Sequence, residues 1–155
     1  MPTLSRGDRL LLVAALSAFG VVNAAYLTWQ WYAAASASWC DLDAYFSCSK
    51  VRDSAWSAVG GVPTATVGVA GFAILLGLAV LALRGTQRLG PSSLDRWLLL
   101  FAIGGAAVGA GLTVVEVFVI QAICILCVFG FALDLAVLGL AVTLPAADQS
   151  ASRSE

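Results

Sequence analysis

Long segments without a charged residue constrain this fold more than any other feature of the sequence. No Asp, Glu, Lys or Arg occurs in residues 10–40, 54–83 or 97–115, and a fourth run, 117–147, contains a single charge at Asp134. An α-helix of roughly 20 apolar residues crosses about 30 Å of hydrocarbon. The pattern therefore predicts four membrane-spanning helices, near residues 9–32, 62–83, 95–118 and 122–144.

The composition supports one membrane domain. Of the 155 residues, 61% are hydrophobic and 11% are charged, whereas a soluble domain carries about 25% charged residues. A chain of this length cannot bury so much apolar surface, so lipid has to form part of its solvent. We predict an all-α membrane protein with its domain at residues 1–144 and a disordered cytoplasmic tail at 145–155. The net charge of −1 excludes broad attraction to nucleic acid.

Basic residues indicate how the helices cross the membrane. Lys50 and Arg52 lie between the first two predicted helices, and the other basic residues flank the opposite helix ends: Arg6, Arg9, Arg84, Arg88, Arg96 and Arg153. Because excess Lys and Arg mark the cytoplasmic face, both termini are predicted inside. The loop at 33–61 and the turn before Cys124 then lie together outside the membrane.

The four cysteines form two spaced pairs on that outer side. Cys40 and Cys48 lie in the external loop, and Cys124 and Cys127 open the fourth predicted helix. A separation of three places the second pair on one helical face, and a helix N-terminus favours thiolate. Such a pair is typical of reversible thiol exchange, but a static disulfide or a metal site with all four cysteines also fits the spacing. The loop pair is either a structural staple or a shuttle that carries electrons to the second pair.

Asp134 lies within the fourth predicted helix, and Glu116 lies near the end of the third. Asp134 shares one helical face with Phe131 and the two cysteines, at spacings of three and four. An acid within a span faces the bundle interior or a wet cavity, where it either relays protons or joins helices through hydrogen bonds. Glu116 is expected near the outer interface, solvated or paired with backbone donors.

Two motifs, separated by two predicted helices, carry a resemblance to a known family. The first contains Cys40-Asp41, Ser47-Cys48-Ser49-Lys50-Val51, Ser54 and Gly61-Val62-Pro63, and the second is Glu116-Val117-Phe118-Val119-Ile120-Gln121-Ala122-Ile123-Cys124-Ile125-Leu126-Cys127. Together they resemble the vitamin K epoxide reductase family over residues 10–144, and the Gly-Val-Pro run looks like its bacterial branch.

This resemblance implies a four-helix bundle around a quinone, in the cytoplasmic (inner) membrane of a bacterium. The loop between the first two helices is then an extracytoplasmic cap. By the same match, Cys127 is the thiolate nearest the quinone and Cys124 is its resolving partner. Cys48 is expected to attack Cys124, and Cys40 to exchange with an outside thiol protein.

Three further positions are expected to bind the quinone, which is menaquinone, ubiquinone or vitamin K. Ser54 matches a family serine near the quinone head. Phe131 stands where animal members carry a tyrosine, so a hydroxyl donor is missing there and support for epoxide reduction is left open. Asp134 is expected beside the quinone, where it supplies protons or joins helices.

The predicted function is a thiol–quinone oxidoreductase that makes disulfides in extracytoplasmic proteins. Bacterial relatives often carry a fused thioredoxin-like domain. No such domain is expected here, so the expected partner is a separate thioredoxin-like extracytoplasmic protein. The alternative is a non-catalytic membrane protein with four spans and structural or metal-binding cysteines. Electron flow in the outward direction, from quinol to the thiol protein, also stays open, because residues do not reveal relative potentials.

Overall fold

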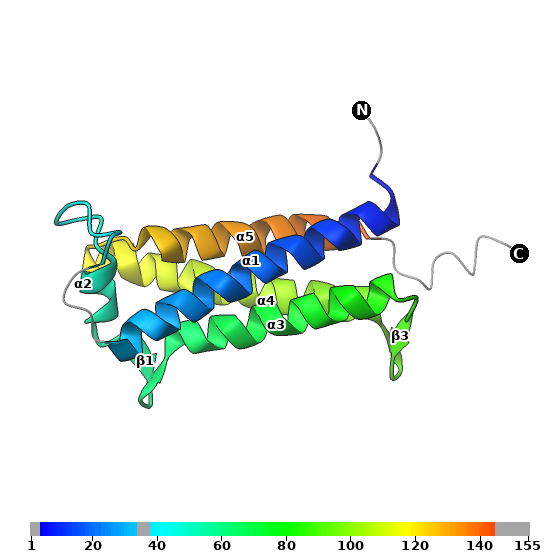
Figure 1. Cartoon of the computed structure of the whole chain (residues 1–155), viewed down its shortest axis with the longest axis horizontal. Coiled ribbons are helices and arrows are strands. Elements are labelled where there is room, and N and C mark those ends of the chain that lie inside the picture. The colour runs from blue at the N-terminus through cyan, green and yellow to red at the C-terminus, as the bar shows by residue number, and fades with distance from the viewer. Residues whose placement is uncertain (1–3, 34–37, 145–155) are drawn as a thin grey trace, which may run out of the picture.

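A computed structural model describes residues 4–33 and 38–144 (Figure 1). Within this part of the chain, four spans are long and apolar enough to cross a membrane. They are built by α1 (Arg6–Ala33), α3 (Thr64–Leu83), α4 (Leu94–Val115) with its π-helical continuation η1 (Glu116–Ile120), and α5 (Ile125–Val142). The prediction of four spanning helices is confirmed. The tail at 145–155, predicted to be disordered, lies outside the described residues.

The long helices run side by side as a bundle (Figure 1). α1 packs mainly against α3 and α5, and α4 packs against the same two helices, so α1 and α4 occupy opposite corners. Large side chains such as Phe19, Val22 and Phe118 are exposed on the outside of the bundle. Since these helices are apolar around most of their circumference, this outer surface suits contact with lipid.

Three short elements lie at the ends of the bundle. α2 (Cys48–Arg52) and the hairpin of β1 (Ala58–Val59) and β2 (Val62–Pro63) occupy one end, which we call the cap end, and the hairpin of β3 (Arg88–Leu89) and β4 (Ser92–Ser93) occupies the other (Figure 1). The cap between the first two spans, predicted to be a loop or a short helix, contains the helix α2, but neither hairpin was predicted. The turn of the first hairpin requires glycine, because Gly60 and Gly61 have φ angles of 60° and 83°.

The buried side chains form two clusters that differ in composition. The larger is aliphatic and fills the half of the bundle away from the cap, with residues that include Leu10, Leu78, Leu98 and Val137. The smaller lies at the cap end and is built around three cysteines, Cys40, Cys48 and Cys124. Thus aliphatic side chains form the core of one half of the bundle, and cysteines form the buried cluster at the cap end.

Polar contacts close the end away from the cap. Arg6 of α1 lies 2.7 Å from the Asp95 carboxylate at the start of α4, and the Asp95 side chain is 4% exposed. Arg9 donates to the backbone carbonyl of Thr143, just past α5. These contacts tie three helices together where the large aliphatic cluster ends.

Candidate active site

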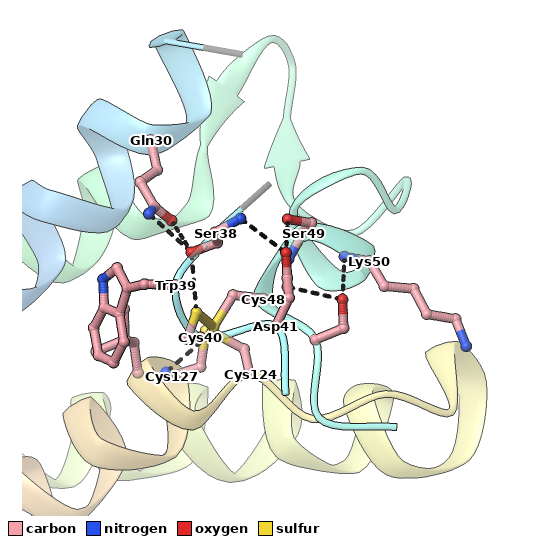
Figure 2. The surroundings of a disulfide bond; sticks show 12 residues. Gln30, Ser38, Trp39, Cys40, Asp41, Cys48, Ser49, Lys50, Cys124 and Cys127 are labelled. Carbon is pink, nitrogen blue, oxygen red and sulfur yellow. Dashed lines mark hydrogen bonds between the residues drawn. A yellow bond between two sulfur atoms is a disulfide. The ribbon is translucent and has the colours of Figure 1, made fainter. Parts of the chain in front are cut away.

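Three sulfur atoms lie next to one another under the cap. Cys40 and Cys48 are joined in a disulfide, and the thiol of Cys124 lies 3.2 Å from the Cys48 sulfur (Figure 2). Cys127 is also a free thiol, one helical turn farther along α5. Cys40, Cys48 and Cys124 are each at most 3% exposed. The structure therefore brings the two predicted cysteine pairs into contact, in the arrangement that thiol–disulfide exchange requires.

Backbone hydrogen bonds hold the cap loop against the turn that precedes α5. Phe46 and Ile123 form a parallel bridge. Ser47 donates its N–H to the carbonyl of Ile123 at 3.1 Å, and Ile123 donates to the carbonyl of Tyr45 at 2.7 Å. Because these residues immediately precede Cys48 and Cys124, the bridge fixes the distance between the two sulfurs.

Asp41 organises the cap loop from within. Its carboxylate accepts hydrogen bonds from the backbone N–H groups of Ser38 and Ser49 and from the hydroxyls of Ser47 and Ser49, at 2.5–2.9 Å (Figure 2). Burial raises the pKa of Asp41, but hydrogen bonds from these three serines outweigh it and hold the pKa well below its usual value. Asp41 is thus a structural centre of the loop, whereas the sequence pattern had indicated only a polar external loop.

Cys124 caps the N-terminus of α5. Its backbone is extended, at φ −89° and ψ 111°, and its sulfur accepts the N–H of Cys127 at 3.3 Å. Interaction with Cys127 lowers the pKa of the Cys124 thiol, and the backbone N–H groups of the first helical turn contribute, although burial opposes them. The helix begins at Ile125 rather than near residue 122, because residues 121–124 form the turn.

Glu116 lies directly beneath this turn. It is 4% exposed, and its Oε2 accepts the backbone N–H of Cys124 at 3.1 Å. Its carboxyl group also interacts with the Cys127 side chain. The expected backbone donor is therefore present, but solvation is wrong, because the π-helical turn of η1 places this side chain inside the bundle.

A cavity of about 680 Å³ extends from the sulfurs into the bundle. Its walls are mostly apolar, and six of the seven predicted site residues line it: Cys48, Ser54, Cys124, Cys127, Phe131 and Asp134. Cys40 does not line the cavity, whereas its disulfide partner Cys48 does. A cavity of this size and character is typical of sites that bind small, mainly apolar ligands.

The deeper wall of the cavity depends on two glycines of α4. A Cβ atom on Gly105 would lie 2.6 Å from Oδ1 of Asp134, and a Cβ on Gly109 would overlap the Phe131 ring. Asp134 is 5% exposed, and its Oδ2 has no hydrogen-bond partner among the residues that the structure describes. The expected interior position of this acid is confirmed. Ser54, near the cap, donates its hydroxyl to the Val51 carbonyl at 2.7 Å.

In the described part of the chain, no three His, Cys, Asp or Glu side chains gather as ligands for a metal ion. Two of the four cysteines are bonded to each other, so their sulfurs are not available as thiolate ligands. A family model described as Vitamin K epoxide reductase family matches residues 11–142. The chain belongs to the vitamin K epoxide reductase family. The family resemblance seen in the two motifs is therefore confirmed.

Membership of the vitamin K epoxide reductase family settles the broad class of the protein. Its members are membrane redox enzymes of the quinone and disulfide kind, and this chain shares with them the four apolar helices and a cysteine disulfide. Glu116 and Asp41 are the two site residues whose roles sequence reasoning missed. Both lie within the motifs that carry the resemblance, which was the available signal.

Proposed function

We propose that this protein transfers electrons from thiols of an extracytoplasmic protein to a membrane quinone, and so generates disulfides outside the cytoplasm. The observation that carries the proposal is the contact of 3.2 Å between Cys124 and the Cys40–Cys48 disulfide at the mouth of an apolar cavity. A disulfide with only a structural role does not require a free thiol in contact with one of its sulfurs.

The electron path follows from the order of the sulfurs. A reduced partner protein reduces the Cys40–Cys48 disulfide and leaves oxidised. The Cys48 thiolate then attacks a Cys124–Cys127 disulfide, which forms a Cys48–Cys124 bond and frees Cys127. Attack of Cys40 on Cys48 restores the loop disulfide and frees Cys124. The observed arrangement, with one loop disulfide and two thiols, corresponds to the state at the end of this step.

The last step returns the second pair to its oxidised form. Cys124 and Cys127 give up two electrons and form a disulfide, and one quinone takes up these electrons with two protons to become quinol. Cys127 is the proposed donor because it lines the cavity, whereas Cys124 is the thiol in contact with the loop disulfide. We propose menaquinone, ubiquinone or a vitamin K-like quinone as the acceptor.

Ser54, Phe131 and Asp134 are proposed to surround the bound quinone. All three line the cavity, on different elements. Phe131 offers an apolar ring and no hydroxyl, so polar contacts to the quinone come from other groups. The mainly apolar wall suits a ring and an isoprenoid tail that enter from the lipid.

The proposed orientation places the cap outside a bacterial cytoplasmic membrane. Lys50 and Arg52 are the basic residues of the cap end, and the larger group at 6–9 and 84–96 lies at the other end. Since excess Lys and Arg mark the cytoplasmic side, the sulfurs face the oxidising compartment. A thioredoxin-like thiol protein of that compartment is the proposed partner.

The test is quinone-dependent thiol oxidation by the purified protein in lipid nanodiscs, with mass spectrometry of the co-purified lipids. We expect a reduced dithiol protein to be oxidised only when a quinone is present, with one quinol formed for each disulfide. A stoichiometric metal, or disulfides that are inert to mild reductant, would favour the non-catalytic alternative.

Cysteine variants separate the steps. We expect Cys127→Ala to abolish quinone reduction, because the donor to the quinone is lost. Cys124→Ala removes the resolving partner, so the Cys127 thiolate and the quinone should remain together in a coloured complex that visible absorbance detects. Full turnover in both variants would refute the relay.

A further inference from the structure

The reaction moves protons as well as electrons, and the thiol pair alone does not explain how they cross the buried site. Building on the function proposed above, we infer that Glu116 carries a proton between Cys127 and the quinone in the cavity. This role makes Glu116 a further catalytic residue, because its carboxyl group interacts with a reacting sulfur.

The position of Glu116 supports this role. Its side chain is nearly inaccessible to solvent at 4% exposure, and it lines the same cavity as Cys127. One carboxyl oxygen accepts the N–H of Cys124, and the group also interacts with the Cys127 side chain. The carboxyl group therefore lies next to a thiol that loses a proton, and it lines the cavity in which the proton acceptor is proposed to bind.

The backbone is irregular at the point where it delivers this side chain. The α-helical pattern of α4 changes to the π-helical η1 at Glu116, and Gln121 follows with a left-handed φ of 54°. The carbonyl of Glu116 accepts the N–H of Ala122 at 3.1 Å, which closes the turn. Single π-helical turns occur mostly at functional sites, and left-handed backbone at a residue other than glycine costs about 1–3 kcal/mol. These departures from regular geometry bring Glu116 under the cysteine turn.

The proton balance defines the step. When the thiols form a disulfide, two protons leave sulfur, and the quinone binds two protons as it becomes quinol. Glu116 accepts the proton of Cys127 and releases it to a quinone oxygen, so the carboxyl group returns to its starting state. General acid–base groups of this kind contribute about 10²–10⁴-fold to a rate.

Other ionisable groups face the same space and contribute to any pH dependence. On the elements packed around η1 these are the two thiols and Arg52 of α2, whose guanidinium pairs with Asp53 at 3.0 Å. Asp134 lines the cavity one helical turn beyond Phe131, deeper in the bundle than Cys127. The titrations of the two thiols and of Asp134 accompany that of Glu116 in the wild type and remain when Glu116 is replaced.

The test is Glu116→Gln in nanodiscs, compared with wild type. The amide oxygen can still accept the N–H of Cys124, but it cannot carry a proton. We expect kcat for quinone reduction to fall about 100-fold, with KM for the quinone within about twofold, and Glu116→Asp to recover much of the loss. The rate at which a small dithiol exchanges with the Cys40–Cys48 disulfide should not change.

A second measurement needs no quinone. Alkylation of Cys127 as a function of pH should follow two coupled titrations in the wild type, one from the carboxyl and one from the thiol. Glu116→Gln should show the thiol titration without the carboxyl component. A purely structural role would leave this pH profile unchanged.

Asp95→Asn is the matched control, because Asp95 is an equally buried acid at the far end of the bundle and does not line the cavity. We expect it to keep wild-type kcat per folded molecule. Wild-type kcat with an unaltered pH profile in Glu116→Gln overturns the inference about Glu116. If Glu116→Gln does not fold, the pH profile of Cys127 alkylation in the wild type decides, and a thiol titration without any carboxyl component overturns the inference. Failure of the wild type itself to reduce quinone overturns the proposed function instead.

Discussion

At the scale of single residues, the cap loop depends on one carboxylate. Asp41 binds Ser38, Ser47 and Ser49 from two sides and thereby closes the loop around the disulfide. A hydrogen bond to a charged group contributes about 1.5–3 kcal/mol. Removal of this charge should therefore loosen the loop more than any change at its exposed rim.

We expect Asp41→Asn to raise the opening rate of the cap at least tenfold, because the amide group cannot accept from all four donors. Hydrogen exchange at the Ser49 N–H measures this opening. Lys50→Gln is the control, because Lys50 is exposed and lies in α2 beside Ser49. It should leave the exchange of the Ser49 N–H unchanged. Equal protection of Ser49 in Asp41→Asn and wild type would contradict the role of the carboxylate.

The same carboxylate sets a pH dependence. Its pKa is lowered in the folded loop, so it stabilises the loop at every pH above the ordinary Asp value of about 3.9. This stabilisation declines once the pH falls below the ordinary Asp value, and it is lost as the pH passes through the lower pKa that Asp41 has in the folded loop. Wild-type Ser49 exchange, corrected for its intrinsic pH dependence, should therefore show constant protection from neutral pH to about pH 4. Protection should fall in stronger acid, and Asp41→Asn should lack this fall.

Sequence reasoning at this scale succeeded where the residue type carries the chemistry. Cys40, Cys48, Cys124 and Cys127 are readable as redox candidates in any fold, and the structure brings the two pairs together. The placement of Glu116 was not readable, because burial depends on the π-helical turn that carries it. Spacing in a regular helix gives no indication of such a turn.

At the scale of secondary-structure elements, α4 and α5 approach closely because glycines of α4 have no side chain at the contact. Gly105 and Gly109 lie one turn apart on α4, opposite Asp134 and Phe131 on α5. Glycine at these two positions allows the helices to pack closely. Here the close packing also shapes the inner wall of the cavity.

We expect Gly105→Ala to displace the Asp134 carboxyl group, because the new methyl would lie 2.6 Å from Oδ1. Overpacking of this kind costs about 1–3 kcal/mol, and the apparent affinity for quinone should weaken. Thermal unfolding and quinone titration measure the two effects. Gly111→Ala is the control, since nothing lies within 4 Å of its Cβ position. An identical melting temperature and affinity in Gly105→Ala would show that Asp134 is not constrained there.

Sequence analysis placed the long helices well because the membrane enforces their length. Hydrocarbon thickness sets a minimum for each apolar run, so runs such as 54–83 reveal their spans directly. The hairpins at 58–63 and 88–93 have strands of only two residues. Strands so short have no alternating pattern to read, so the sequence did not predict them.

At the scale of the whole molecule, the two ends differ in charge and in function. The cap end holds the sulfurs, and the opposite end holds the Arg6–Asp95 pair and most of the basic residues. The proposed orientation rests on this asymmetry. The distribution of basic residues predicted that both cysteine pairs share one end, whereas the contact between Cys48 and Cys124 required the structure.

Lys50 offers a direct test of orientation, because it is the single lysine of the chain and its side chain is exposed. We expect an amine reagent that cannot cross membranes to label Lys50 on intact cells or spheroplasts. The N-terminal amine, on the predicted cytoplasmic side, is the internal control and should react after permeabilisation. Labelling of Lys50 only after permeabilisation would mean that the cap end faces the cytoplasm, opposite to the proposed orientation.

The bridge between Phe46 and Ile123 has a kinetic consequence for the proposed relay. Because the backbone holds Cys48 beside Cys124, internal exchange proceeds at an effective concentration that no dissolved thiol reaches. The proposed relay also depends on two encounters, one with the thiol protein in the aqueous space and one with the quinone in the bilayer. Protein substrates arrive by diffusion in three dimensions through the aqueous space, and quinol departs by diffusion in two dimensions along the bilayer. Exchange between the two cysteine pairs is then not the slow step of the proposed relay, and the supply of thiol protein and of quinone acts on the steps before and after it.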